Sequence, residues 1–257
     1  MCRMISISWF SGRPWSFFGL VLLGFPSVVS SGPPLVGDDP GTPGKGHLEV
    51  IAAIDGASRS SMDSAQVPLL DVAYGLSPNT EISLGMARQQ IKANLEDRRS
   101  GWGDAAIGYK WRFLTHKALQ LAISPSYSHV MRHSSVSRGL AEGFSILNLP
   151  LIASLEIDEN VWNFQIGYSV NSMGSKAFDY SIALGRPLGT SCQLWFELWG
   201  AADNHFANQE LNFRIGLDYT LRERIHVLAA IGGPITSSFG HEDELNYDFY
   251  LGLQWFR

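Results

Sequence analysis

Apolar and polar residues alternate along most of the chain with a period of two. In VWNFQIGYSV, Trp162, Phe164 and Ile166 share one face, and Asn163 and Gln165 share the other. Successive side chains of a strand point to opposite faces, so this period predicts strands with one apolar and one polar face. The same alternation recurs in HLEVIAAI, EISLGMA, QLAISPSY, FDYSIAL, CQLWFELWG, LNFRIGLDY and LNYDFYLGLQW. With the weaker segments between them, the pattern predicts about twelve strands.

The connections between these strands alternate in length. Short connections are predicted at 76–79, 115–117, 158–160, 187–191 and 221–224. Longer ones are predicted at 58–66, 91–101, 131–143, 171–177, 203–208 and 236–244. An even number of strands with short turns at one end and long loops at the other is typical of bacterial outer-membrane barrels. We therefore expect an all-β fold: a single transmembrane antiparallel β-barrel with short periplasmic turns and longer extracellular loops.

Charged residues within the strands fall on the polar face. In GWGDAAIGYKWRF, Asp104, Lys110 and Arg112 oppose the apolar Ile107 and Tyr109. Pointing a basic residue at lipid near the membrane midplane costs about 2–4 kcal/mol, so these side chains are expected in the lumen. The predicted lumen-lining charges are Asp104, Lys110, Arg112, Asp179, Glu197, Arg214, Asp218 and Asp248. They could line an open pore or neutralise one another in a plugged interior.

Aromatic residues support the barrel prediction. They gather beside the short connections and the C-terminus, where a girdle at the membrane interface is expected. The members are Tyr74, Trp111, Phe113, Trp162, Tyr219 and Trp255.

The N-terminal residues have the layout of an export signal. Arg3 and Arg13 precede the apolar WSFFGLVLLGF, and the small residues of SVVSSG follow it. This order predicts a cleaved signal peptide at residues 1–30, although the apolar run could also act as a membrane anchor. A Gly/Pro-rich lead-in follows at 31–46, expected to be flexible, and the outer-membrane barrel itself is predicted at 47–257. Only Cys192 would remain after cleavage, so no internal disulfide is expected.

Candidate chemistry outside the lumen is sparse. The best catalytic candidates are His129 and His133, which lie near serines in YSHVMRHSS at the long-loop end of a strand. No spacing matches a metal site or a nucleophile elbow, so the sequence predicts no enzyme, no catalytic residue, no metal and no cofactor. The net charge of −5 argues against a nucleic-acid partner. Basic loop residues could meet lipopolysaccharide phosphates or form a solvated surface: Lys92, Arg98, Arg99, Arg132 and Arg138.

Four stretches together resemble a known family. They are the lead-in PLVGDDPGTPGKGHLEV, the hairpin YGLSPNTEISLG, the strand GWGDAAIGYKWRF and the closing YLGLQWF. The chain thereby resembles the outer-membrane β-barrel family named for the meta-pathway of phenol degradation. The resemblance implies a barrel in the outer membrane that passes small molecules, including hydrophobic or aromatic ones. Barrels of this kind commonly end on an aromatic residue that the insertion machinery reads, whereas here Arg257 follows Phe256.

These observations predict a channel or transporter in the outer membrane of a Gram-negative cell. Small solutes would pass passively through the lumen, and the partners expected are membrane lipid, lipopolysaccharide, the solute and the barrel-insertion machinery. Two alternatives stay open: an outer-membrane lipid-modifying enzyme, and a plugged structural or adhesive barrel.

Overall fold

The computed structural model describes residues 34–93, 97–239 and 244–257, so the predicted signal peptide lies outside the described residues. Within these ranges the chain forms a single sheet of thirteen strands. They are β1 (Leu48–Arg59), β2 (Met62–Ser77), β3 (Thr80–Ala93), β4 (Arg99–His116), β5 (Leu119–Ile123), β6 (Ser126–Val130), β7 (Ile146–Ile157), β8 (Asn160–Asn171), β9 (Lys176–Pro187), β10 (Cys192–Asp203), β11 (Gln209–Arg222), β12 (Ile225–Ser237) and β13 (Leu245–Phe256).

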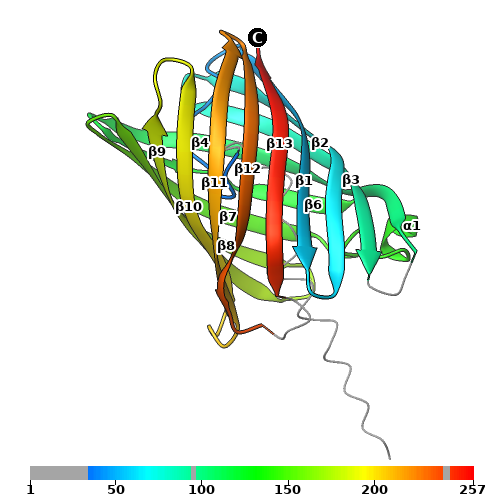
Figure 1. Ribbon diagram of the computed structural model, residues 1–257. Coiled ribbons are helices and arrows are strands. Elements are labelled where there is room, and N and C mark those ends of the chain that lie inside the picture. Colours follow the sequence, from blue (N-terminus) through cyan, green and yellow to red (C-terminus); the bar gives the residue numbers. More distant parts are fainter. Residues whose placement is uncertain (1–33, 94–96, 240–243) are drawn as a thin grey trace, which may run out of the picture.

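The sheet closes on itself as an antiparallel barrel (Figure 1). β1 pairs with both β2 and β13, and β3 pairs with β4, so the described sheet has no open side between its first and last strands. β5 and β6 each pair with β4 on one side and with β7 on the other, and together they form one wall strand. The wall therefore has twelve strands, and the predicted all-β antiparallel barrel is confirmed.

The wall strand made of β5 and β6 is interrupted at Ser124 and Pro125. The alternation of QLAISPSY predicts one continuous strand here. Proline has no N–H to donate to a ladder, so the regular pairing stops at this residue. The break is bridged by backbone hydrogen bonds, from Tyr109 N–H to the Pro125 carbonyl (2.9 Å) and from Ser124 N–H to the Pro150 carbonyl (3.2 Å).

The two faces of the strands have opposite character, as the period of two requires. On the outer surface Ile107 and Ile166 expose 59% and 56% of their area. On the inner face Lys110 and Glu197 expose only 2% each. An apolar outer band around a polar interior is the arrangement of a barrel that crosses a lipid bilayer. Alternation thus decides which side chains reach the lumen.

The barrel has a short-turn end and a long-loop end. At the short-turn end two-residue turns join β2 to β3 and β4 to β5. At the same end Leu48, where β1 begins, and Arg257 exchange backbone hydrogen bonds of 2.9 and 2.8 Å. The long-loop end carries the connection between β6 and β7, which holds the short helix α1 (His133–Val136) (Figure 1). The long connection predicted at 58–66 is wrong, because both strands extend into it and only residues 60 and 61 separate β1 from β2. No helix among the described residues is long and apolar enough to cross a membrane.

Residues 34–41 lie inside the barrel, and we refer to them as the lumen segment. Leu35 and Asp38 expose only 6% and 7% of their area. The chain then leaves the lumen at the short-turn end, where the Thr42 hydroxyl donates to the Pro78 carbonyl (3.0 Å), before β1 begins. The lead-in that the sequence suggested to be flexible is, over this stretch, held by the interior of the barrel.

Candidate functional site

Lys110 of β4 fastens the lumen segment to one side of the wall. Its Nζ donates to Asp38 Oδ1 at 2.8 Å and to the Gly41 carbonyl at 3.2 Å. Glu81 Oε1 on the neighbouring β3 lies 3.8 Å from the same nitrogen. Buried charges are stable only when paired, and this cluster supplies acids from both the wall and the lumen segment.

Arg214 of β11 forms a second cluster across the lumen. Its Nε donates to Asp248 Oδ1 on β13 at 3.0 Å, and its Nη2 lies 3.8 Å from Asp55 Oδ1 on β1. Nη1 donates to the Pro34 carbonyl at 3.4 Å. The guanidinium thereby joins three wall strands to the start of the lumen segment.

Glu197 of β10 holds the lumen segment by its backbone. The carboxylate accepts the Val36 N–H at 2.8 Å and the Gly37 N–H at 2.7 Å. Beside it, Gln165 of β8 accepts the Asp38 N–H at 2.9 Å. The lumen segment lies outside the strand ladder, and these side chains satisfy backbone donors that would otherwise be unpaired in the interior.

The other predicted lumen charges lie away from these clusters. Arg112 braces the short-turn end by donating to the Pro78 carbonyl at 2.9 Å, and Asp218 pairs with His226 Nδ1 at 2.8 Å. Asp104 lies toward the long-loop end, opposite Val130 of β6. The eight predicted residues therefore fall at different depths, and only Lys110, Glu197, Arg214 and Asp248 belong to the two clusters or hold the lumen segment directly.

Several site residues were not identified from the sequence. Asp38 belonged to a stretch without any period, which gives no signal of where its side chains point. Glu81 and Asp55 are not among the predicted lumen charges, although both oppose apolar neighbours in alternating segments. A charged side chain costs free energy when it faces lipid. The same reasoning, applied to every acidic residue within a strand, places both side chains in the lumen.

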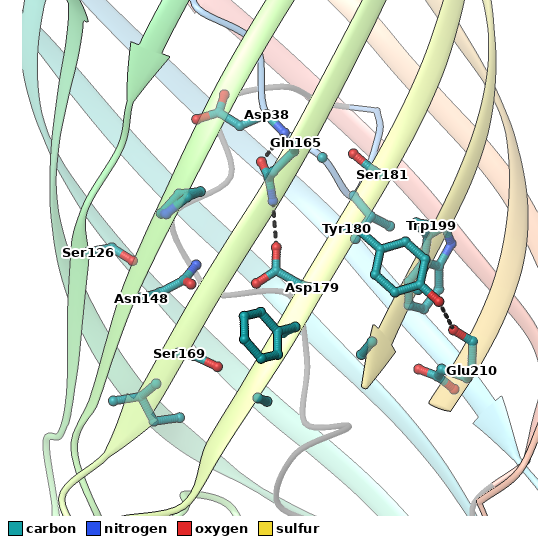
Figure 2. A pocket seen from close by; sticks show the side chains of 18 of the residues that line it. Asp38, Ser126, Asn148, Gln165, Ser169, Asp179, Tyr180, Ser181, Trp199 and Glu210 are labelled. Atoms are coloured by element: carbon teal, nitrogen blue, oxygen red, sulfur yellow. Dashed lines mark hydrogen bonds between the residues drawn. The ribbon is translucent and has the colours of Figure 1, made fainter. Parts of the chain in front are cut away.

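A cavity of about 210 Å³ lies between the lumen segment and the long-loop end (Figure 2). Asp179 of β9 lies in its wall and accepts a hydrogen bond from Gln165 Nε2 at 2.8 Å. Trp199 lies on one side of the pocket in Figure 2, and Ser126 and Ser169 lie on the other. Tyr180, next to Asp179, is on the outer face of β9, and its hydroxyl donates to the Glu210 carbonyl at 3.2 Å. The lumen segment thus closes the cavity toward the short-turn end.

The long-loop end holds the histidines singled out from the sequence. His129 Nδ1 and Ser145 Oγ are 2.7 Å apart, and the imidazole stacks on Tyr127 with ring centroids 6.3 Å apart. His133 instead begins α1. In the loop between β6 and β7, burial and the neighbouring Asp104 carboxyl raise the pKa of Glu142 to about 7.

Two basic residues considered as lipopolysaccharide contacts bond to the protein itself. Arg99 Nη1 donates to the Arg138 carbonyl at 2.9 Å, and Arg138 Nη2 donates to the Ser100 carbonyl at 2.7 Å. These bonds tie the loop that carries α1 to the end of β4. Both guanidinium groups therefore have a structural role in this loop.

Comparison with known proteins shows a likeness in fold. No protein-family model matches the chain, and no curated protein matches its sequence. An outer-membrane channel from Pseudomonas putida has 10% sequence identity and a TM-score of 0.65 over 83% of this chain and 95% of its own. The NanC porin has 9% identity and a TM-score of 0.56 over 81% and 98% of the two chains. The translocator domain of the autotransporter NalP from Neisseria meningitidis has 14% identity and a TM-score of 0.53 over 82% and 88%. The chain therefore has the fold of a transmembrane outer-membrane barrel.

Proposed function

We propose that this protein is an outer-membrane channel, not an enzyme, through whose lumen small solutes pass passively once the lumen segment moves aside. The fold likeness to an outer-membrane channel supports this proposal, as does the sequence resemblance to the family named for the meta-pathway of phenol degradation. That resemblance adds hydrophobic or aromatic solutes to those that the channel would pass. The short turns would face the periplasm and the long loops the cell exterior.

The observation that carries the proposal is how the lumen segment is held. Its contacts with the wall are hydrogen bonds and ion pairs to Glu197, Lys110, Gln165 and Arg214. A hydrogen bond to a charged group contributes about 1.5–3 kcal/mol, and water that enters the lumen as the segment leaves would solvate the charges left behind. The wall strands bond to one another without the segment, so its departure would leave the barrel closed.

We also propose a location and partners for this protein. A cleaved signal peptide at residues 1–30 would direct export, and the barrel-insertion machinery would place the chain in the outer membrane. The apolar outer band would contact membrane lipid, and exposed basic residues at the long-loop end, such as Arg132 and Lys92, would meet lipopolysaccharide.

The test is solute flux into liposomes that hold the full chain or its Glu197→Ala variant. Removing this carboxylate frees two N–H groups of the lumen segment, so the variant should swell the liposomes faster than the wild type in neutral solutes. Glu156→Ala, at an exposed acid, is the matched control and should behave as the wild type. Folded Glu197→Ala protein that gives no flux above protein-free liposomes would refute the channel.

A second candidate function is hydrolysis of lipid at the outer surface, favoured by the His129–Ser145 contact. A hydroxyl 2.7 Å from an imidazole nitrogen is within reach of a general base. Among the described residues, however, no group hydrogen-bonds the other ring nitrogen of His129 to orient it. If the site is catalytic, His129→Ala and Ser145→Ala should each abolish phospholipid hydrolysis by detergent-solubilised protein, while His133→Ala should not. Absence of any wild-type hydrolysis would exclude this function.

A further inference from the structure

The cavity above the lumen segment has two chemically different walls. Ser126 of β6, Asn148 of β7 and Ser169 of β8 lie on one side in Figure 2, and Trp199 of β10 lies on the other. The first wall offers hydroxyl and amide groups, which both donate and accept hydrogen bonds. The second offers aromatic surface, which packs against the flat face of a ring.

The serine hydroxyls of the cavity are not used by the protein. Among the described residues, no group hydrogen-bonds the side chains of Ser126, Ser169 or Ser181, although all three line the cavity. By contrast, the Gln165 amide, which also lines the cavity, is occupied by Asp38 and Asp179. The free hydroxyls are therefore available to a bound solute.

The charges of the cavity wall exclude anions. In the described part of the lining, the two cations are Arg59 and Arg214, and each already forms an ion pair with a wall carboxylate. Asp179 pairs with no cation of the described residues and lies between the two walls in Figure 2. An anionic solute would enter a site richer in carboxyl groups than in cations and would bury its charge unpaired.

We propose that this cavity binds an uncharged ring that carries several hydroxyl groups, of about the size of a monosaccharide. An apolar cavity of about 150 Å³ holds benzene, so about 210 Å³ accommodates a six-membered ring with small substituents. The ring face packs on Trp199, and the hydroxyls bond to Ser126 and Ser169. The inference names a solute class for the channel proposed above and rests on that function for its meaning in the cell.

Calorimetric titration of the detergent-solubilised full chain tests the solute class. The probes are glucose and galactose, each beside its own uronate, with phenol as a ring that has one hydroxyl. At least one hexose should bind about tenfold more tightly than its uronate, because the carboxylate finds no partner in the cavity. A uronate that binds as tightly as its hexose, or binding of phenol without binding of any hexose, would overturn the proposal.

Paired variants test the place of binding. Ser126→Ala with Ser169→Ala should weaken hexose binding about tenfold, because two hydrogen bonds are lost. The matched control is Ser83→Ala with Ser154→Ala, which removes two inward hydroxyls outside the cavity and should leave the affinity unchanged. Asp179→Asn should strengthen uronate binding. Equal effects of the two double variants would contradict the site.

The binding and flux measurements test the cavity site and the channel independently of each other. Calorimetry requires no passage through the barrel, and the liposome assay requires no saturable site. Flux through Glu197→Ala without hexose binding would overturn the inference and leave the channel standing. Hexose binding without flux in any variant would overturn the channel and leave the binding site standing.

Discussion

At the scale of single residues, the interior depends on complete ion pairs. The Lys110 side chain is 1% exposed and has Asp38 Oδ1 at 2.8 Å and Glu81 Oε1 at 3.8 Å. A buried pair contributes little net stability, but removal of one partner leaves the others charged without compensation. Removing Lys110 should therefore lower the stability of the fold by more than the intact ion pairs contribute to it.

We expect Lys110→Met to lower the free energy of unfolding by about 3–5 kcal/mol, measured by urea titration of protein folded into lipid vesicles. Lys92→Met, at an exposed lysine of β3, is the control and should stay within about 0.5 kcal/mol of the wild type. Adding Asp38→Asn to Lys110→Met should recover part of the loss, because the two side chains are in direct contact. An unchanged midpoint for Lys110→Met would show that the cluster is not energetically coupled.

At the scale of elements, the strands were predictable and the lumen segment was not. A period of two indicates which face of a strand is polar, and it assigns to that face Lys110, Glu197 and Arg214, all of which are buried in the structure. Residues 34–41 have no period, because the segment is neither strand nor helix and its Gly and Pro residues give no face. Its position is decided by charges on distant strands, such as Glu197, which is 161 residues from Val36.

The loop between β6 and β7 should loosen as the pH rises. The pKa of Glu142 in the folded loop, about 7, lies above its ordinary value of 4.5. Below pH 4.5 the Glu142 carboxyl is protonated in both the closed and the open loop, and the closed loop is most stable. Between pH 4.5 and 7 the carboxyl ionises more readily in the open loop, so the closed loop loses that stability as the pH rises. Trypsin should cut at Arg132 or Arg138 faster at pH 8 than at pH 6, relative to Glu142→Gln at the same pH. Equal pH dependence of the two proteins would contradict this account.

At the scale of the whole molecule, strand number and the two unequal ends followed from the spacing of turns. Twelve strands leave a lumen between that of small barrels filled by side chains and that of wide aqueous porins. Strand count therefore could not indicate whether the lumen is open. The answer lies in the lumen segment, which fills the middle of the barrel and leaves a cavity on its long-loop side.

In the channel that we propose, the lumen is the solute path and the lumen segment blocks it. Gly37 and Ser181 offer a way to lock the segment, because a Cβ added at Gly37 would lie 3.0 Å from Ser181 Cβ. A disulfide needs a Cβ separation of about 3.5–4.5 Å, so a shift of about 1 Å suffices. The variant Gly37→Cys with Ser181→Cys is made with Cys192 replaced by Ser, and each single cysteine variant serves as a control.

Conductance of this double-cysteine variant in planar bilayers is the most direct measurement. We predict that the oxidised protein is silent and that reductant produces conductance steps, while the single-cysteine controls do not respond to reductant. Conductance that is the same before and after reduction of a verified disulfide would contradict the claim, as would a folded, reduced protein that never conducts.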